Sequence, residues 1–301
     1  KTIDSMAVLG AEGTYYMSEK NIYVATETDA WRKTKISRYS YEKGTIKYAC
    51  EKVINGTILN QFSMDEYEGN LRFAATTYDD NGKTTNGLYI VDSSFKTIGS
   101  VSRLAPGERI YSARFMGESV YFVTYRETDP LFLVDVSDPA NPVVKDKLKI
   151  PGFSDYLHPF GENMLLGIGS IQDKEGNSYV KLSMFDISNP EKVKEIHSKK
   201  LGKNTVQNMG SDHKGIVVDA ERNRIAFGVE NYDDTTDSFY EIFSYDKQKG
   251  FQNIAKLSLE ESYSTESRGL YIGDYFYLCK TSSGICVYDT KKYKKIRSIA
   301  Y

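Results

Sequence analysis

Nine residues of the sequence have side chains that could form a binding or catalytic site. They are Arg109, Tyr111, Arg114, Asp155, Tyr156, His158, Asp212, His213 and Arg268. Tyrosine supplies rigid contact area, arginine supplies planar pairs of donors, and histidine changes charge near neutral pH. These residue types are typical of recognition surfaces, and we therefore take the nine as the candidate site.

Several kinds of chemistry could use these residues. Asp155 and His158, with Asp212 and His213, could ligate a metal, but no spacing matches an established ligand motif, and we expect no metal and no cofactor. Asp155, Asp212 and Glu266 could supply paired carboxylates for glycoside chemistry, which depends on a separation that sequence does not give. No strand–elbow–helix context is present for a nucleophilic serine, which argues against a hydrolase triad.

The arginines among the nine residues have two interpretations. Arg109, Arg114 and Arg268 could each bind a ligand carboxylate through two parallel hydrogen bonds. Arginines of this kind more often pair with acids of the same chain. The nine residues could therefore form either a binding site or a polar plug that satisfies itself.

An internal repeat determines the expected fold. A strand ends in an acidic residue at intervals of 43 to 60 residues, the differences between the sequence numbers Glu42, Asp92, Asp135, Asp186, Asp246 and Asp289. Four short strands with their turns need roughly 40–50 residues, the size of one propeller blade. An Asp at this place can accept backbone N–H bonds in the following turn, so we interpret Asp135 and Asp186 as structural.

The strand before each of these acids is nearly all apolar, as in YFVTY, LLGIG and IAFGV. Such strands are covered on both faces, as when one blade stacks on the next. The sequence therefore predicts an all-β fold, a β-propeller of about six four-stranded blades, ahead of a large β-sandwich. We expect the strand Thr2 to Leu9 to pair with the last blade, Arg268 to Tyr301, and so to close the ring by joining the N- and C-terminal strands.

This fold places the candidate residues. Each lies where the chain leads into the innermost strand of a blade, and all such positions open on one face of a propeller. We therefore expect the nine side chains to gather at one end of the central channel, the default place for a ligand site.

Composition limits the class of protein. The 301 residues carry a net charge of −2, which argues against a nucleic-acid partner. No apolar run approaches the ~20 residues of a membrane-spanning helix. Even punctuation by Gly and Pro indicates one domain, 1–301, which we expect to be a fragment of a longer secreted or surface protein. If Ser282 and Ser283 form a two-residue turn, Cys279 and Cys286 lie opposite each other, and we expect both, like Cys50, to be thiols.

Three acidic loops join second and third strands. They surround Asp79 and Asp80, Asp173, and Asp233 and Asp234. An Asp-Asp-Asn-Gly turn partly resembles a calcium loop, but the full pattern ending in a bidentate Glu is missing. We interpret these loops as solvated hairpin tips.

Four segments resemble a known family. They are Asn60–Ala74, Leu104–Ser119, Tyr125–Pro142 and Ile150–Gly169. They are similar to segments of bacterial secreted proteins that carry a C-terminal β-propeller domain, distantly akin to WD-repeat propellers. The resemblance implies a propeller and an extracytoplasmic location, secreted or on the cell surface. It implies no activity and no catalytic residue.

Together these observations favour a non-enzymatic binding or interaction module that uses the propeller mouth. Its ligand would be a protein, a peptide or a glycan. The alternative is a hydrolase or lyase acting on glycans or peptides at the same mouth. Opposed carboxylates or a set of metal ligands in the channel would distinguish the enzyme from the module.

Overall fold

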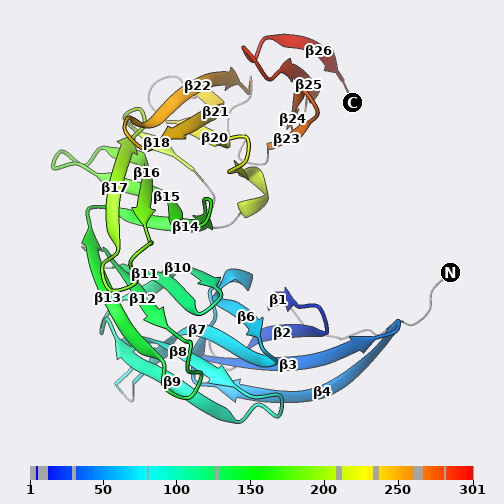
Figure 1. Cartoon of the computed structure of the whole chain (residues 1–301), viewed down its shortest axis with the longest axis vertical. Coiled ribbons are helices and arrows are strands. Elements are labelled where there is room, and N and C mark those ends of the chain that lie inside the picture. The colour runs from blue at the N-terminus through cyan, green and yellow to red at the C-terminus, as the bar shows by residue number, and fades with distance from the viewer. Residues whose placement is uncertain are drawn as a thin grey trace. The chain divides into compact units, whose positions relative to one another are not determined.

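A computed structural model of the chain describes residues 5, 13–28, 32–79, 81–125, 129–207, 212–232, 237–259, 267–280 and 283–300 (Figure 1). The chain divides into two compact units, unit 1 (Lys1–Lys149) and unit 2 (Ile150–Tyr301). The described strands form six antiparallel sheets, three in each unit, and the described helices are two 3₁₀ turns of three residues. The predicted all-β class is thereby confirmed, and the six sheets of four or five strands fit the predicted blades.

Unit 1 contains sheets 1 to 3, each formed by consecutive segments of the chain. Sheet 1 consists of β1 (Gly13–Met17), β2 (Asn21–Thr28), β3 (Lys33–Glu42) and β4 (Thr45–Ile54). Sheet 2 consists of β5 (Gly56–Thr57), β6 (Met64–Tyr67), β7 (Asn70–Tyr78), β8 (Thr84–Val91) and β9 (Thr97–Leu104). Sheet 3 consists of β10 (Arg109–Met116), β11 (Ser119–Tyr125), β12 (Asp129–Asp135) and β13 (Val143–Ile150).

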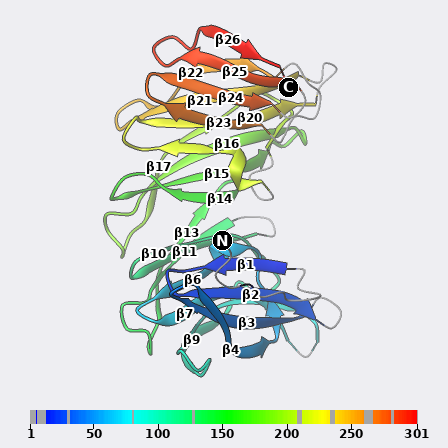
Figure 2. The same cartoon turned by 90° about the vertical axis from the view of Figure 1, so that its right-hand side faces the viewer.

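Unit 2 contains sheets 4 to 6, which stack in chain order within the unit (Figure 2). Sheet 4 consists of β14 (Phe153–Pro159), β15 (Met164–Gln172), β16 (Ser178–Asp186) and β17 (Lys194–Lys200). Sheet 5 consists of β18 (Thr205–Val206), β19 (Val217–Asp219), β20 (Arg224–Asn231), β21 (Asp237–Asp246) and β22 (Gly250–Ser258). Sheet 6 consists of β23 (Arg268–Ile272), β24 (Tyr275–Lys280), β25 (Gly284–Asp289) and β26 (Lys295–Ile299).

Apolar side chains fill the space between neighbouring sheets. Tyr23 of sheet 1 packs in one cluster with Phe73 of sheet 2, and Leu88 of sheet 2 packs in another with Phe122 of sheet 3. In unit 2 a cluster joins sheets 5 and 6. Strands covered on both faces explain why the second strand of each repeat is apolar at nearly every position.

The acids that end the third strands hold the turns that follow. In five sheets the Asp Oδ1 accepts the backbone N–H of the residue two positions later; these acids are Asp92, Asp135, Asp186, Asp246 and Asp289. This is the geometry of an Asx-turn, and it confirms the structural interpretation of Asp135 and Asp186. Asp79 and Asp173 do the same in hairpin tips, through the N–H groups of Asn81 and Glu175.

The inner strands of sheets 2 and 5 are each divided by an insertion. The 3₁₀ turn η1 (Gln61–Ser63) lies between β5 and β6, and η2 (His213–Gly215) lies between β18 and β19. Both pieces of each inner strand pair with the same second strand, β7 or β20. The insertion in sheet 5 carries two of the candidate residues, Asp212 and His213.

Two further expectations concern the chain termini and the cysteines. The predicted strand Thr2 to Leu9 lies outside the described residues, so its pairing with sheet 6 stays a prediction. The expected pairing of Cys279 with Cys286 is wrong, because Cys279 pairs with Ile285 and Leu278 pairs with Cys286. A shift of one residue puts the two side chains on opposite faces of the sheet. All three cysteines are free thiols.

Candidate functional site

The innermost strands β10 and β14 carry six of the nine candidate residues and share one irregularity. Ile110 and Ser112 pair with consecutive residues of β11, so Tyr111 is an extra residue, and Asp155 is the extra residue of β14 in the same way. A β-bulge redirects the side chains around it and is common beside functional sites. The bulges therefore place Tyr111 in unit 1 and Asp155 in unit 2 at equivalent positions of their sheets.

Unit 1 holds Arg109, Tyr111 and Arg114, all on β10. Arg109 is exposed, and Tyr111 is 36% exposed with its ring edge-on to Tyr125 at 5.5 Å between centroids. The Arg114 guanidinium carbon lies 4.0 Å from the centre of the Phe62 ring. Arg114 is therefore engaged in a cation–π contact with the η1 insertion, the structural alternative to ligand binding.

Asp155 is a half-buried carboxylate in unit 2. Its Oδ2 accepts a hydrogen bond of 2.6 Å from Nε2 of Gln207, the residue that follows β18. Burial raises the pKa of Asp155 to about 6, against the opposing effect of the Gln207 hydrogen bond. An acid with a pKa near neutral is common at functional sites.

Asp212 and Arg268 form an ion pair in unit 2. The Arg268 Nη1 and Nη2 atoms lie 2.7 and 2.9 Å from the two carboxylate oxygens of Asp212, which stands at the N-cap of η2. The Arg268 side chain is 37% exposed and the Asp212 side chain is 19% exposed. The two residues thus satisfy each other, as a polar plug would require.

Tyr156, His158 and His213 meet at a cavity of about 540 Å³ within unit 2. We call it the inner-strand pocket, because its walls come from β14, from η2 with β19, and from β23. The pocket is lined by Tyr156, His158, His213, Ile216, Val217, Val218, Asp219, Ala220, Glu221, Arg222, Gly269, Leu270 and Tyr271. Sheets 4, 5 and 6 all contribute to it, and its size is that of a small-molecule site.

A hydrogen bond determines the tautomer of one pocket histidine. Nδ1 of His158 lies 2.7 Å from the carbonyl oxygen of Pro159. A carbonyl oxygen only accepts, so Nδ1 must carry the proton, and Nε2 of the neutral ring carries the lone pair.

Asp219 and Arg222 of the pocket wall are paired with each other. Asp219 Oδ1 accepts the backbone N–H of Arg222 at 2.9 Å, and Asp219 Oδ2 accepts from Arg222 Nη1 at 2.8 Å. These hydrogen bonds, chiefly the backbone one, lower the pKa of Asp219. The guanidinium carbon of Arg222 lies 5.8 Å from the centre of the Tyr271 ring.

A buried tyrosine fixes the insertion to sheet 5. Tyr240, fully buried on β21, donates its hydroxyl to the carbonyl of Gly215 in η2 at 2.8 Å. Gly269 on β23 leaves room for that ring, because an added Cβ would lie 2.7 Å from the Tyr240 hydroxyl and 2.6 Å from Phe276. Desolvation raises the pKa of Tyr240, which stays a neutral donor. The position of His213 therefore depends on the packing between sheets 5 and 6.

Two further possibilities are a metal site and a membrane-spanning helix. Across the described ranges, no group of three or more His, Cys, Asp or Glu side chains could hold a metal ion. Helices in that part of the chain are all too short and polar to cross a membrane. Glu266, considered above as a partner carboxylate, lies outside the described residues.

Sequence reasoning missed Gln207, Asp219, Arg222 and Tyr271. Tyr271 follows Arg268 on the same strand, so its place on an innermost strand could have been recognised. Asp219 ends β19 and Arg222 lies in the turn that follows, a segment that the sequence shows only as DAERNR. No pattern in the sequence indicates that Gln207 contacts Asp155, since 52 residues separate them.

Comparisons with known proteins agree with the fold. The profile of the family described as "Beta propeller domain" matches residues 1–293. An uncharacterised protein of Methanocaldococcus jannaschii is 47% identical over 150 residues, 49% of this chain and 24% of that protein. An uncharacterised protein of Archaeoglobus fulgidus is 34% identical over 287 residues, 95% of this chain and 41% of that protein. Both relatives are archaeal, and the chain spans less than half the length of either.

Solved structures with low sequence identity share the fold. BamB from Moraxella catarrhalis gives a TM-score of 0.57 at 13% identity and covers 97% of this chain and 73% of its own. A putative 6-phosphogluconolactonase from Bacteroides uniformis gives 0.54 at 12%, covering 97% and 85%. A computationally designed protein, Ika8, gives 0.53 at 10%, covering 96% and 74%. These similarities concern the fold alone.

Proposed function

This chain belongs to the beta propeller domain family, and we propose that it is a non-enzymatic binding module whose ligand occupies the inner-strand pocket of unit 2. One observation carries the proposal: His158, His213 and Tyr271 come from three different sheets and line one cavity. Aromatic and imidazole side chains give contact area together with hydrogen-bonding groups. The ligand class is a peptide, a protein segment or a glycan.

The acids near the pocket favour binding over catalysis. Asp219 is held by Arg222, and Asp212 is held by Arg268. A carboxylate that is already paired is poorly suited to act as a nucleophile or base, because its charge is stabilised in the resting state. The two acids that line the pocket, Asp219 and Glu221, lie two residues apart in one segment, so they do not form an opposed pair drawn from different sheets.

The proposal includes the setting of the module. We place it outside the cytoplasm, as the C-terminal propeller of a longer protein of the kind secreted by bacteria, with its ring closed by residues 2 to 9. The resemblance of the four segments quoted above supports this, as does the greater length of both archaeal relatives. Protease treatment of intact cells, followed by detection of the native protein, tests the location. Protection until the cells are lysed would exclude it.

The binding test uses thermal shift with a tripeptide library and a set of neutral and acidic oligosaccharides as probes. A probe that binds in the inner-strand pocket should raise the melting temperature of the wild type and not that of Tyr156→Ala/His213→Ala. His197→Gln is the matched control, because His197 lies on the outer strand β17, contacts Tyr245 and does not line the pocket. A probe that shifts all three proteins equally binds elsewhere and would count against the pocket.

A hydrolase or lyase remains the second candidate, and Asp155 is the observation that favours it. A carboxyl group with a pKa of about 6 can donate a proton near neutral pH. The test is turnover of the probes that bind. If the wild type cleaves a probe and the Asp155→Asn variant does not, the chain is an enzyme and the binding-module proposal is wrong.

A further inference from the structure

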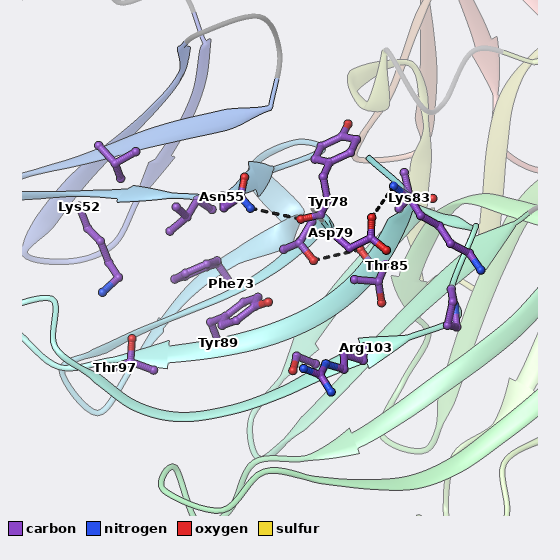
Figure 3. Close-up of a pocket in the computed structure, with 16 residues that line it drawn as sticks. Lys52, Asn55, Phe73, Tyr78, Asp79, Lys83, Thr85, Tyr89, Thr97 and Arg103 are labelled. Atoms are coloured by element: carbon purple, nitrogen blue, oxygen red, sulfur yellow. Dashed lines mark hydrogen bonds between the residues drawn. The ribbon is translucent and has the colours of Figure 1, made fainter. Parts of the chain in front are cut away.

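Unit 1 contains a separate cavity of about 780 Å³, between β4 of sheet 1 and the face of sheet 2 (Figure 3). Its walls are formed by Lys52, Val53, Ile54, Asn55, Phe73, Thr77, Tyr78, Asp79, Lys83, Thr84, Thr85, Tyr89, Thr97, Ser102, Arg103 and Pro106. None of the nine candidate residues is among them. The volume is that of a site for a ligand of drug or disaccharide size.

One wall of this cavity is a β-bulge. Asn86 pairs with Leu104 and Leu88 pairs with Val101, so two residues of β9, Ser102 and Arg103, stand opposite the single residue Gly87. Arg103 has a φ of 60°, in the left-handed region that few residues other than glycine adopt. Bulges redirect side chains, and a strained backbone of this kind persists only where surrounding structure imposes it.

A buried asparagine holds the bulge in place. Asn86 is completely buried, and its Nδ2 donates to the carbonyl oxygens of Leu104 and Ala105 at 3.3 and 3.4 Å. Its Oδ1 accepts from the Thr76 hydroxyl at 2.9 Å. Gly87 is required as well, because an added Cβ would lie 2.9 Å from both the Tyr89 hydroxyl and the Val101 carbonyl. The core of sheet 2 therefore fixes the direction of Ser102 and Arg103.

The described lining carries a positive charge. Lys52, Lys83 and Arg103 contribute three cations, and Arg103 and Lys83 form no ion pair with any described residue. Asp79 is the acid of the lining, and its Oδ1 already accepts the backbone N–H of Lys83 at 2.7 Å. Its sequence neighbour Asp80 lies outside the described residues. The chain has a net charge of −2, yet three cationic side chains lie around this one cavity.

The uncharged part of the lining is aromatic and hydroxylic. Phe73 and Tyr89 stack with their ring centres 5.4 Å apart, and Figure 3 shows them side by side, with Lys52, Lys83 and Arg103 around them. The hydroxyl groups come from Thr77, Thr84, Thr85, Thr97 and Ser102. A ligand that uses all of these groups has a ring, many hydroxyls and a negative charge.

We propose that this cavity binds an acidic saccharide, a sugar ring that bears a carboxylate. The carboxylate would pair with Arg103 and Lys83, since arginine matches the planar geometry of that group and lysine adds a point charge. The threonine hydroxyls would bond the sugar hydroxyls, and the ring would pack against Tyr89. The described residues of sheet 2 supply no glycine-rich anion loop of the kind that cradles nucleotide phosphates, and the many hydroxyl groups suit a sugar better than a base.

The test is calorimetric titration of the whole chain with trigalacturonic acid, with a neutral galactose trimer as the matched probe. We expect the acidic trimer to bind and the neutral trimer to bind about tenfold more weakly or not at all. Arg103→Gln and Lys83→Gln should each weaken binding of the acidic trimer by about tenfold. Gln at position 103, like Arg, must adopt the left-handed backbone conformation. A loss of binding at an unchanged melting temperature would therefore result from the lost charge and not from unfolding.

Lys174→Gln is the control, because Lys174 is an exposed lysine in the equivalent hairpin tip of sheet 4, whose Asp173 makes the same backbone bonds as Asp79. It should bind as the wild type does. Failure of the acidic trimer to bind, equal binding of the neutral trimer, or undiminished binding by the Arg103→Gln/Lys83→Gln variant would overturn the proposal. Binding of adenosine monophosphate in preference to the trimer would also overturn it. The Tyr156→Ala/His213→Ala variant should bind the acidic trimer as the wild type does, which would show that the trimer does not bind in the inner-strand pocket.

Discussion

Arg268 presents both Nη atoms to the carboxylate of Asp212, at 2.7 and 2.9 Å. Asp212 stands at the N-cap of η2, where an aspartate usually accepts a backbone N–H, yet its side chain makes no such cap bond. Asn60, at the N-cap of η1 in unit 1, does accept one, from Phe62 at 3.0 Å. The ion pair with β23 has therefore replaced the cap and ties the insertion of sheet 5 to sheet 6.

A double-mutant cycle of Asp212→Ala and Arg268→Ala should give a coupling free energy on the order of 1 kcal/mol, because the pair is bidentate but only partly buried. Urea unfolding of the wild type, both single variants and the double variant measures it. Arg268→Lys should recover less than half of the coupling, since an ammonium cannot bind both oxygens in parallel. A coupling near zero would mean that the two residues lie together without stabilising the fold.

Asp289→Ala should destabilise the chain more than Asp135→Ala. The Asp289 carboxylate accepts three backbone N–H groups, from Lys291, Lys292 and Lys294, whereas Asp135 accepts one, from Ser137. By analogy with helix caps we expect a loss of about 1 kcal/mol for Asp135 and a larger loss for Asp289. Chemical unfolding measures both values, and an equal or reversed order would contradict the turn-holding role.

These turn acids show why so much of the fold could be predicted from sequence. An Asp that bonds its own turn is a local feature, so its periodic recurrence marks each sheet without any knowledge of tertiary contacts. The bulges at Tyr111 and Asp155 and the insertion at η2 are different, because they depend on pairing with distant strands. The wrong register for Cys279 has a local cause: the ladder pairs Lys280 with Gly284 across three intervening residues, where the prediction assumed a two-residue turn.

Asp155 should make the chain less stable as the pH rises. Its pKa of about 6 lies above the value of about 3.9 for an unfolded chain, so the folded state holds an extra proton between these two values. The stability that protonated Asp155 contributes is therefore fully present below about pH 4 and is lost as the pH rises through about 6. Asp155→Asn should melt above the wild type at pH 7.5, with the difference closing toward pH 4, as scanning calorimetry across that range would show.

Asp173 is the control with the opposite sign. Its pKa is lowered to about 2, first by the side chain of Asn177 and also by the Tyr179 hydroxyl and backbone donors. A lowered pKa gives stability that is present above about pH 4 and is lost as the pH falls toward 2. Asp173→Asn should therefore melt below the wild type at neutral pH.

The Asp155 prediction would be contradicted if the melting temperatures of Asp155→Asn and the wild type changed in parallel with pH, because the Asp155 carboxyl would then not be desolvated.

The candidate site was predictable in its residue types and much less so in its contacts. Tyr156, His158 and His213 do line one cavity, because all three lie on or beside innermost strands of unit 2. The pairing of Asp212 with Arg268 could not be read from the sequence, since 56 residues separate them and other acids were equally available. Asp155 was recognised as a candidate, but its raised pKa depends on burial that only the folded sheet provides.

The pocket histidine His158 should be the Nδ1–H tautomer when neutral. The Nε2–H form is the usual one for a free imidazole, but here Nδ1 lies 2.7 Å from the Pro159 carbonyl, which has no hydrogen to donate. His197 serves as an internal reference, because its Nδ1 lies 2.9 Å from the Tyr245 hydroxyl, which can donate. The common tautomer is therefore compatible with His197 and incompatible with His158.

Long-range ¹H–¹⁵N correlation spectra at pH 8 distinguish the two forms, since a protonated ring nitrogen and one with a lone pair resonate far apart. His158→Gln and His197→Gln assign the signals, and the third set belongs to His213. The result matters for binding, because the Nδ1–H form gives the neutral ring an acceptor at Nε2 and protonation converts it to a donor. A ligand that donates to His158 should therefore bind better to the neutral ring than to the protonated ring. An Nε2–H signal for His158 would show that the contact with Pro159 does not form in solution.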